Sequence, residues 1–138
     1  MIKTFETAAS LHEVRAEASM ARAGFETVGG KKIFFINFRG CEVAEALVVA
    51  GQARSEIAKC PPASVLTLTD ITDAKYDDTV TDALKNLAKS NKPFVKASAV
   101  VGVTGLRKVI YSMITMFSKR QMMLFPDLES AKKWLLTQ

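Results

Sequence analysis

Hydrophobic positions along the chain recur with two periods, one typical of strands and the other of helices. Runs that are apolar, or that alternate with polar residues, predict five strands at 25–28, 32–38, 65–70, 94–103 and 122–125. Apolar residues three and four positions apart predict helices at 41–59, 79–90, about 105–118 and from Leu128 onward. Gly29-Gly30 predicts a hairpin between the first two strands, and Asp127 predicts a cap for the last helix.

Strands that alternate with helices on this scale predict an α/β fold with right-handed connections and a largely parallel sheet. Ahead of them, residues 7–23 are rich in alanine and in other good helix formers. That stretch carries a weak apolar stripe at helical spacing, formed by Leu11, Val14, Ala18 and Ala21. We expect residues 1–24 to form a helical appendage and residues 25–138 to form a single α/β domain. The appendage would dock on the core or on a second copy of the chain.

The composition changes this picture mainly by exclusion. Of the 138 residues, 49% are hydrophobic and 24% are charged, which is typical of one globular domain. No apolar run approaches the roughly 20 residues that span a bilayer, and the first residues lack the apolar core of a secretory signal. Cys41 and Cys60 form no C-x-x-C motif, and His12 is the only histidine. We therefore expect a cytoplasmic protein with buried or half-buried thiols, no metal and no cofactor.

The formal net charge of +5 is unevenly distributed along the chain. Residues 92–138 carry eight basic and two acidic side chains, so the remaining residues sum to −1. An acidic cluster surrounds Lys75 and consists of Asp70, Asp73, Asp77, Asp78 and Asp82. One acidic patch and one basic end suit charge-steered contacts with a partner. The basic residues form no stripe interleaved with aromatic residues and no helix-turn-helix pattern, so we expect no nucleic-acid binding.

Four phrases between Lys32 and Leu136 occur in a recognisable order. They are IFFINFRG from Ile33, VLTLTDITD from Val65, KPFVKASAVVGVTGLRK from Lys92, and Phe125 followed by ESAKKWL from Glu129. These phrases resemble the SpoIIAA-like branch of the STAS superfamily, which is also similar to small CRAL-TRIO lipid-binding domains. The resemblance implies a SpoIIAA-like βα superhelix, with a four-to-five-stranded, mostly parallel sheet and helices mainly on one side. None of the phrases is a catalytic signature.

The resemblance also implies a candidate phosphorylation site. Anti-anti-sigma members of the superfamily bind a partner kinase and are phosphorylated on a Ser or Thr at the start of the helix that follows an Asp-ending strand. Aligning Asp70 with that Asp places Asp78-Thr79 on the family's Asp-Ser/Thr pair, which makes Thr79 the candidate phosphoacceptor. The family's next residues, Ser-Gly, are replaced by Val80-Thr81. Alternatively, Asp78 or Thr79 only caps the helix. The candidate partner-binding loop carries Asp70, Asp73 and Asp78.

The predicted helix at 105–118 has more apolar residues than one buried face needs. We expect its core face to be formed by Leu106, Val109, Ile110, Met113 and Phe117. Its apolar surface is widened by Tyr111, Ile114 and Met116, and basic residues bracket it at Arg107, Lys108, Lys119 and Arg120. Such a helix suits a lipid interface or an adaptable apolar pocket. The candidate ligand- or membrane-facing residues are Arg107, Lys108, Tyr111, Ile114, Met116 and Phe117. Alternatively, Tyr111 and Met116 pack on the N-terminal helix or across a homodimer.

Three classes of function follow from these features. The leading prediction is a non-enzymatic cytoplasmic regulatory module that presents the loop from Asp70 to Thr79, and the start of the third helix, to an unidentified protein partner. The alternative is a small protein that binds a lipid or another hydrophobic ligand and meets membrane surfaces through the helix at 105–118. An enzyme has the least support, because the only histidine lies in the N-terminal appendage and the chain lacks a Gly-x-Ser-x-Gly motif. Nucleotide binding lacks its glycine-rich phosphate-binding motif around Gly105. Gly105 is expected to ease a tight strand-to-helix turn.

Overall fold

The computed structural model describes residues 22–105, 107–118 and 122–138. Along the chain, the elements are β1 (Ala23–Val28), β2 (Lys31–Asn37), α2 (Val43–Ile57), β3 (Val65–Asp70), α3 (Asp78–Asn91), the 3-10 turn η2 (Lys92–Phe94), β4 (Val95–Val101), α4 (Arg107–Ser118), β5 (Met123–Phe125) and α5 (Leu128–Leu136). Each strand and helix predicted for the α/β domain is present within a few residues of its expected bounds. The predicted N-terminal helix lies outside the described residues, and β1 already begins at Ala23.

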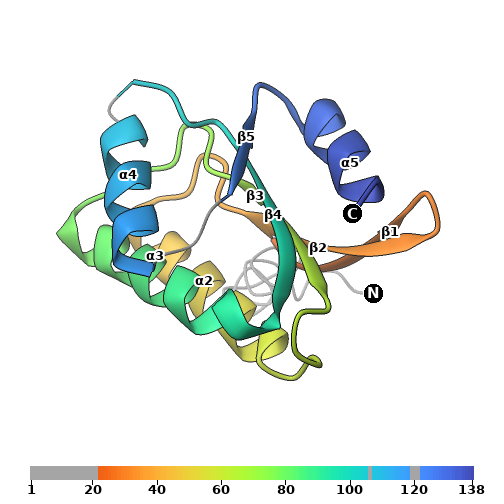
Figure 1. Cartoon of the computed structure of the whole chain (residues 1–138). Helices are drawn as coiled ribbons and strands as arrows, with labels where there is room; N and C mark the ends of the chain where they lie inside the picture. The colour runs from red at the N-terminus through yellow and green to blue at the C-terminus, as the bar shows by residue number, and fades with distance from the viewer. Residues whose placement is uncertain (1–21, 106, 119–121) are drawn as a thin grey trace, which may run out of the picture.

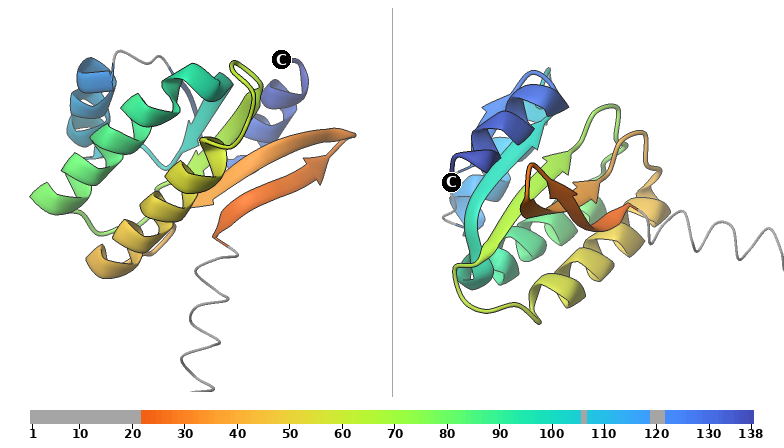
Figure 2. Two further views of the ribbon diagram at one scale, coloured as in Figure 1. Left: turned by 90° about the horizontal axis from the view of Figure 1, so that it is seen from below. Right: turned by 90° about the vertical axis from the view of Figure 1, so that its right-hand side faces the viewer.

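The five strands form one sheet in the order β1-β2-β3-β4-β5. β1 pairs antiparallel with β2, and every later pair of neighbours is parallel. Because the parallel strands follow one another in a single direction, right-handed connections place α2, α3 and α4 on the same face of the sheet. Figures 1 and 2 show these three helices on one face and α5 on the other. The predicted α/β class, the mostly parallel sheet and the placing of helices mainly on one side are confirmed.

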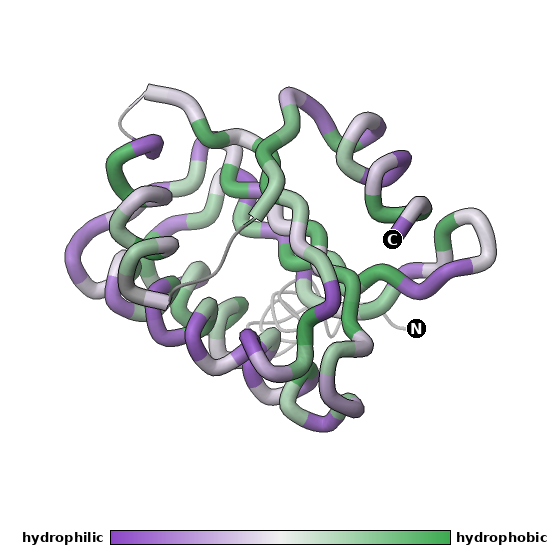
Figure 3. Tube along the Cα trace, in the orientation of Figure 1, coloured by the Kyte–Doolittle hydropathy of each residue, from purple (hydrophilic) through white to green (hydrophobic). Residues whose placement is uncertain are grey.

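The sheet separates two hydrophobic clusters. The larger cluster lies beneath α2 and α3 and includes Phe34, Phe38, Val49, Ala53 and Ile57. The smaller cluster lies beneath α5 and includes Ile33, Leu66, Leu68, Ala99, Val101, Ala131 and Leu135. Neighbouring residues of a strand point to opposite faces, so β2 and β3 each supply both layers. Figure 3 shows the resulting pattern, with the middle strands mainly hydrophobic and the helices alternating between hydrophobic and hydrophilic positions.

Helix α2 buries one of the apolar stripes that its sequence offers. Its fully buried residues are Ala46, Val49, Ala50, Ala53 and Ile57. Ala44 and Ala58 are exposed. An alanine-rich helix offers more than one apolar stripe. The stripe with three alanines packs on the sheet, because small side chains let the helix approach the large rings of Phe34 and Phe38.

Candidate functional site

Two loops meet at the carboxyl ends of β3 and β4, the edge at which open α/β sheets place their ligand sites. The first loop follows Asp70, whose side chain is only 1% exposed. One carboxylate oxygen of Asp70 accepts hydrogen bonds from the amide of Thr72 at 2.9 Å and from its hydroxyl at 2.6 Å. Arg39 lies 3.7 Å from the other oxygen. Asp70 therefore stabilises the conformation of this loop from within the protein. Its side chain is buried and is not accessible to a protein partner.

The second loop begins at Gly102, which touches the first loop directly. Gly102 has a φ of +93°, and a Cβ built on it would lie 2.5 Å from the Thr72 hydroxyl oxygen and 2.6 Å from the Thr72 amide nitrogen. Only glycine fits such a close backbone approach. Three residues later, Gly105 has a φ of +57° in open space, which confirms its predicted role in the turn before α4. The sequence pattern did not single out Gly102, because it lies within an apolar run that predicted continuous strand.

Helix α4 is held mainly by its neighbouring helix. It packs chiefly along α3 and contacts the sheet much less. The hydroxyl of Tyr111 donates a hydrogen bond of 2.8 Å to the carbonyl of Met122, which precedes β5. Burial raises the pKa of Tyr111 above its ordinary value, so this hydroxyl keeps its proton at neutral pH.

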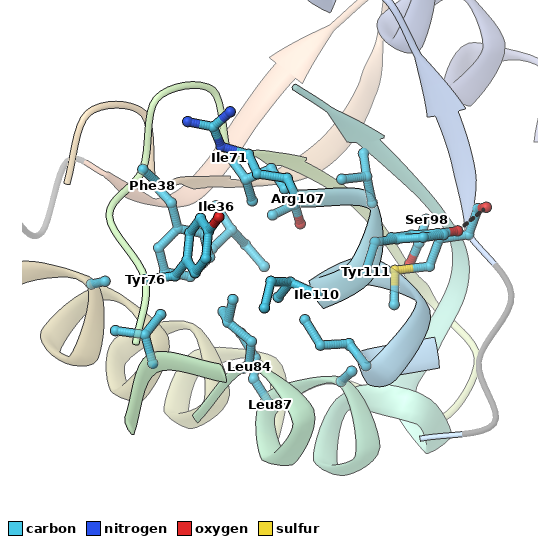
Figure 4. Close-up of a pocket in the computed structure, with 18 of the residues that line it drawn as sticks. Ile36, Phe38, Ile71, Tyr76, Leu84, Leu87, Ser98, Arg107, Ile110 and Tyr111 are labelled. Atoms are coloured by element: carbon cyan, nitrogen blue, oxygen red, sulfur yellow. Dashed lines mark hydrogen bonds between the residues drawn. The ribbon is translucent and has the colours of Figure 1, made fainter. Parts of the chain in front are cut away.

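A cavity of about 90 Å³ lies between α4, α3 and the sheet. It is partly open to solvent and is lined mainly by apolar side chains, which come from β2, from the loop after β3, from α3 and from α4, as Figure 4 shows. Leu84 and Leu87 of α3 form one wall, and Ile110 of α4 faces them. Tyr76 and Phe38 lie toward one end, and Tyr111 and Ser98 toward the other. A cavity lies beneath the helix that the sequence had marked as unusually apolar.

The floor of the cavity is polar, although it belongs to the middle of the sheet. Thr67 and Thr69 of β3 and Ser98 of β4 line it. The hydroxyls of Thr67 and Ser98 are buried and lie 2.7 Å apart, within hydrogen-bond distance. Strands covered on both faces are usually apolar on both. Here the hydroxyls occur on the α4 side only, since Leu66, Leu68 and Ala99 of the same strands point toward α5.

Arg107 lines the cavity from the first turn of α4. Its Nε is buried and has no hydrogen-bond partner among the residues that the structure describes. Its Nη2 lies 3.9 Å from a carboxylate oxygen of Asp73, and the Asp73 side chain is 78% exposed. An exposed ion pair of this length stabilises by no more than about 1 kcal/mol, whereas a buried unpaired donor costs about 1–3 kcal/mol. The guanidinium therefore keeps unused donor capacity beside an apolar cavity.

The predicted core face of α4 is wrong in part. Val109 is 57% exposed and Met113 is 40% exposed, and with Met116 at 78% they form an outward apolar stripe. Ile110 faces the cavity, in agreement with the prediction, and Tyr111 and Ile114 face it as well. This orientation lets the Tyr111 hydroxyl reach the carbonyl of Met122. The side chains of Leu106 and Phe117, and residues Lys119 and Arg120, lie outside the described part of the chain.

The remaining predicted site residues are scattered. Of the ligand- or membrane-facing set, Arg107, Tyr111 and Ile114 line the cavity, while Lys108 and Met116 are exposed away from it. Thr79 is exposed in the first turn of α3. The cap of α3 is Asp77, whose carboxylate accepts a 2.8 Å hydrogen bond from the amide of Val80, so neither Asp78 nor Thr79 caps the helix. Among these, the structure brings Arg107, Tyr111 and Ile114 together at the cavity, with Asp73 beside Arg107.

Cys41 is confirmed as a buried thiol. It lies before α2, and burial raises the pKa of Cys41 from 9.0 to about 11 despite the nearby Arg22 guanidinium. The thiol is therefore protonated and unreactive at neutral pH. Cys60 is half-buried. Within the described residues, no three His, Cys, Asp or Glu side chains are placed to hold a metal ion.

Comparisons with known proteins add no relative. No family model, curated protein or solved structure matches this chain. The SpoIIAA-like resemblance therefore stays a prediction. Over residues 22–105, 107–118 and 122–138, no helix has both the length and the apolar content needed to cross a membrane.

Several lining residues were missed at the level of sequence, notably Thr67, Thr69, Ser98 and Tyr76. The signal for the first three was present. Hydroxyl residues alternate with leucine in Val65-Leu-Thr-Leu-Thr-Asp, and a serine interrupts the small apolar residues of β4. In a strand buried on both faces, such alternation marks one face as polar. No comparable pattern marked Tyr76, which reaches the cavity only because of the loop's path.

Proposed function

We propose that this protein binds a small hydrophobic ligand in the cavity beneath α4. The observation that carries the proposal is the position of that cavity, enclosed by apolar side chains of the sheet, α3 and α4, with a few polar groups at defined places. Cavities of this composition are the usual sites for small ligands in proteins. The sequence ranked a regulatory module first and a ligand-binding protein second, and the cavity supports the reverse order.

The volume of the cavity does not restrict the ligand to a few heavy atoms. The cavity holds about 90 Å³ and is partly open to solvent, so a longer chain can extend through the opening. For scale, an apolar cavity of about 150 Å³ holds benzene. Helix α4 packs chiefly on α3 and is tied to the residue before β5 by the Tyr111 hydrogen bond, so an outward movement of α4 would admit a wider ligand.

A second candidate function is the non-enzymatic protein-binding module of the SpoIIAA-like type. The outward apolar stripe of Val109, Met113 and Met116 favours it, since exposed apolar patches often mark interaction surfaces. Asp73, Asp78 and Thr79 are also exposed and available to a partner. This candidate needs no cavity, and it predicts that filling the cavity leaves partner binding intact.

The test of ligand binding uses a matched pair of substitutions on one helix. Ile114→Trp fills the cavity, whereas Met116→Trp adds the same ring to the outward face of α4. The full chain and both variants are titrated with 1-hexanol and with hexanoate, and amide chemical shifts are followed by NMR. We expect shifts at residues that line the cavity in the wild type and in Met116→Trp, and their loss in Ile114→Trp.

Two results would overturn the proposal. The first is that neither probe perturbs the lining residues of the wild type. The second is that Ile114→Trp, while keeping a folded spectrum, binds both probes as tightly as Met116→Trp does. Native mass spectrometry of the purified full chain provides a separate readout, in which a co-purified small ligand absent from Ile114→Trp supports the proposal.

A further inference from the structure

We infer that the ligand of this cavity carries a carboxylate, which Arg107 binds while the apolar part of the ligand lies between α4 and the sheet. The inference rests on the proposed function and adds the chemical class of the ligand. It assigns a specificity role to a residue whose side chain the fold leaves incompletely paired.

The first support is the state of the Arg107 side chain. Its buried Nε has no partner among the described residues, and its Nη2 approaches Asp73 only to 3.9 Å. That distance exceeds the range of a hydrogen bond, so the contact is a loose ion pair. A guanidinium offers its Nε and Nη donors as a planar fork, which matches the two oxygens of a carboxylate. The Nε is too deeply buried for a ligand atom to reach, so a carboxylate would meet the Nη donors, whose contact with Asp73 is loose.

The second support is the charge of the cavity lining. Arg107 and Lys75 are the charged side chains among the described residues that line the cavity, and no carboxylate lines it. This asymmetry is notable because Asp73, Asp77 and Asp78 all lie in or beside the loop that borders the cavity, yet their side chains stay outside it. Lys75 is exposed and Arg107 is half-buried, so we assign the preference for an anionic ligand over a neutral or cationic one to Arg107.

The third support is the separation of polar and apolar parts. Arg107 lies at the end of the cavity near Ile71 and Tyr76, and its guanidinium reaches the loop after β3 (Figure 4). Leu84, Leu87 and Ile110 form the apolar walls beyond it. A small amphiphile fits this arrangement with its head at the loops and its tail along α3. Short-chain and medium-chain fatty acids are the simplest ligands of that kind.

The test compares two probes with the same tail and different heads. Hexanoate and 1-hexanol are titrated into the wild type, Arg107→Met and Lys108→Met, with amide shifts as the readout. Lys108→Met is the matched control, because Lys108 is the next residue of α4, carries the same charge and does not line the cavity. We expect the wild type to bind hexanoate about tenfold more tightly than 1-hexanol, as a charge-assisted hydrogen bond predicts.

The variants assign that preference to one residue. Arg107→Met should abolish it by weakening hexanoate about tenfold while leaving 1-hexanol nearly unchanged. Lys108→Met should keep the preference within about twofold, because an exposed charge is screened by solvent. Arg107→Lys should give an intermediate value, since it keeps the charge and loses the fork.

Asp73→Asn provides a test in the opposite direction. Asp73 competes with the ligand for the Arg107 guanidinium, and asparagine tolerates the positive φ of 56° at this position. The substitution should tighten hexanoate about twofold or more and leave 1-hexanol unchanged.

The outcomes separate the inference from the proposed function. If 1-hexanol and hexanoate bind the wild type equally, the carboxylate class is wrong and the hydrophobic site stands. If hexanoate is preferred but Arg107→Met keeps the preference in a folded protein, the role of Arg107 is wrong. If neither probe binds, both proposals are overturned.

Discussion

The two faces of the sheet are covered by short helices in contrasting ways. On one face, α5 places Ala131 and Leu135 directly on β3, β4 and β5, and both residues are fully buried. On the other face, α4 packs chiefly on α3, turns Val109 and Met116 outward and leaves a cavity above the same strands. Different side chains of the strands point toward the two faces. Alternate residues of β3 are leucines toward α5 and threonines toward α4.

The difference shows how one strand can serve stability and binding at once. Because neighbouring side chains point to opposite faces, β3 supplies a dry apolar layer and a hydroxyl-bearing cavity floor from six residues. The cluster beneath α5, together with the larger cluster beneath α2 and α3, can then hold the fold together while the space beneath α4 stays loosely filled. We expect substitutions to follow this division.

The largest expected effect is on the α5 face. Leu135→Ala should lower the free energy of unfolding by about 2–5 kcal/mol, because it removes a fully buried side chain from a close-packed layer. The matched substitution Leu84→Ala enlarges an existing cavity around a half-buried residue, and it should cost roughly half as much or less. Urea denaturation measures both. Equal losses would show that the two faces are packed equally well.

The next effect is at the loops that border the cavity. Gly102→Ala should destabilise the protein by about 2–3 kcal/mol, because the new Cβ would collide with Thr72 and the φ of +93° is unfavourable for alanine. Gly105→Ala is the control, since its φ is also positive but its surroundings are open. It should cost only about 1 kcal/mol. Thermal unfolding of both variants tests this, and similar losses would mean that the two loops do not touch.

The fold was largely predictable from the sequence, whereas the orientation of single helices was not. β3 has the bounds that its alternating pattern predicted, because a strand between turn residues leaves little freedom. α4 is apolar on most sides, so periodicity could not decide between Val109 and Ile114 as the inward residue. The sequence also could not decide which residue caps α3, because the side chains of three consecutive residues can accept the capping hydrogen bond. Only the extended backbone at Asp77, with a φ of −144°, settles it.

The candidate site was predictable in part for a related reason. The excess apolar width of residues 105–118 singled out Tyr111, Ile114 and Met116, of which Tyr111 and Ile114 line the cavity. The sheet floor was missed, because β3 and β4 were interpreted by their apolar content and the hydroxyls of Thr67 and Ser98 were not assigned to a face. A cavity depends on the gap between layers, and no local pattern in the chain encodes that gap.

A third experiment asks whether the region before α2, on the same side of the sheet as α4, is as loosely packed as the region beneath α4. Cys41 lies before α2, and burial raises its pKa from 9.0 to about 11. A raised pKa in the folded state means that Cys41 contributes its full stability below pH 9, and that this contribution is lost as the pH rises toward 11. We expect a loss of about 1–2 kcal/mol for the wild type relative to Cys41→Ala.

Urea denaturation at pH 8 and at pH 10.5, in both proteins, measures this contribution. The difference between the two proteins isolates Cys41, because lysines and tyrosines titrate alike in both. If the free energy of unfolding depends on pH in the same way in both proteins, water reaches the Cys41 thiol and the region before α2 is as open as the cavity.

The smallest expected effect is on the cavity floor. Thr67→Val keeps nearly the same shape and removes the hydroxyl that lies 2.7 Å from Ser98, so it should cost about 1 kcal/mol. The double variant Thr67→Val/Ser98→Ala should recover part of that loss, because both partners are then absent. If Thr67→Val is more stable than the wild type, the Thr67 hydroxyl lowers the stability of the fold. The contrast with the leucines on the other face would then be sharper.

The placement of the aromatic rings gives each face its own optical reporter. The chain has one tryptophan and two tyrosines. Trp134 packs against Phe125 on the α5 side, with ring centroids 5.6 Å apart, whereas Tyr76 and Tyr111 both line the cavity. Tryptophan emission therefore follows the scaffold layer and tyrosine absorption follows the cavity. Movement of α4 can therefore be followed in the unlabelled protein by the absorption of its tyrosines, while the emission of Trp134 reports on the packing of α5.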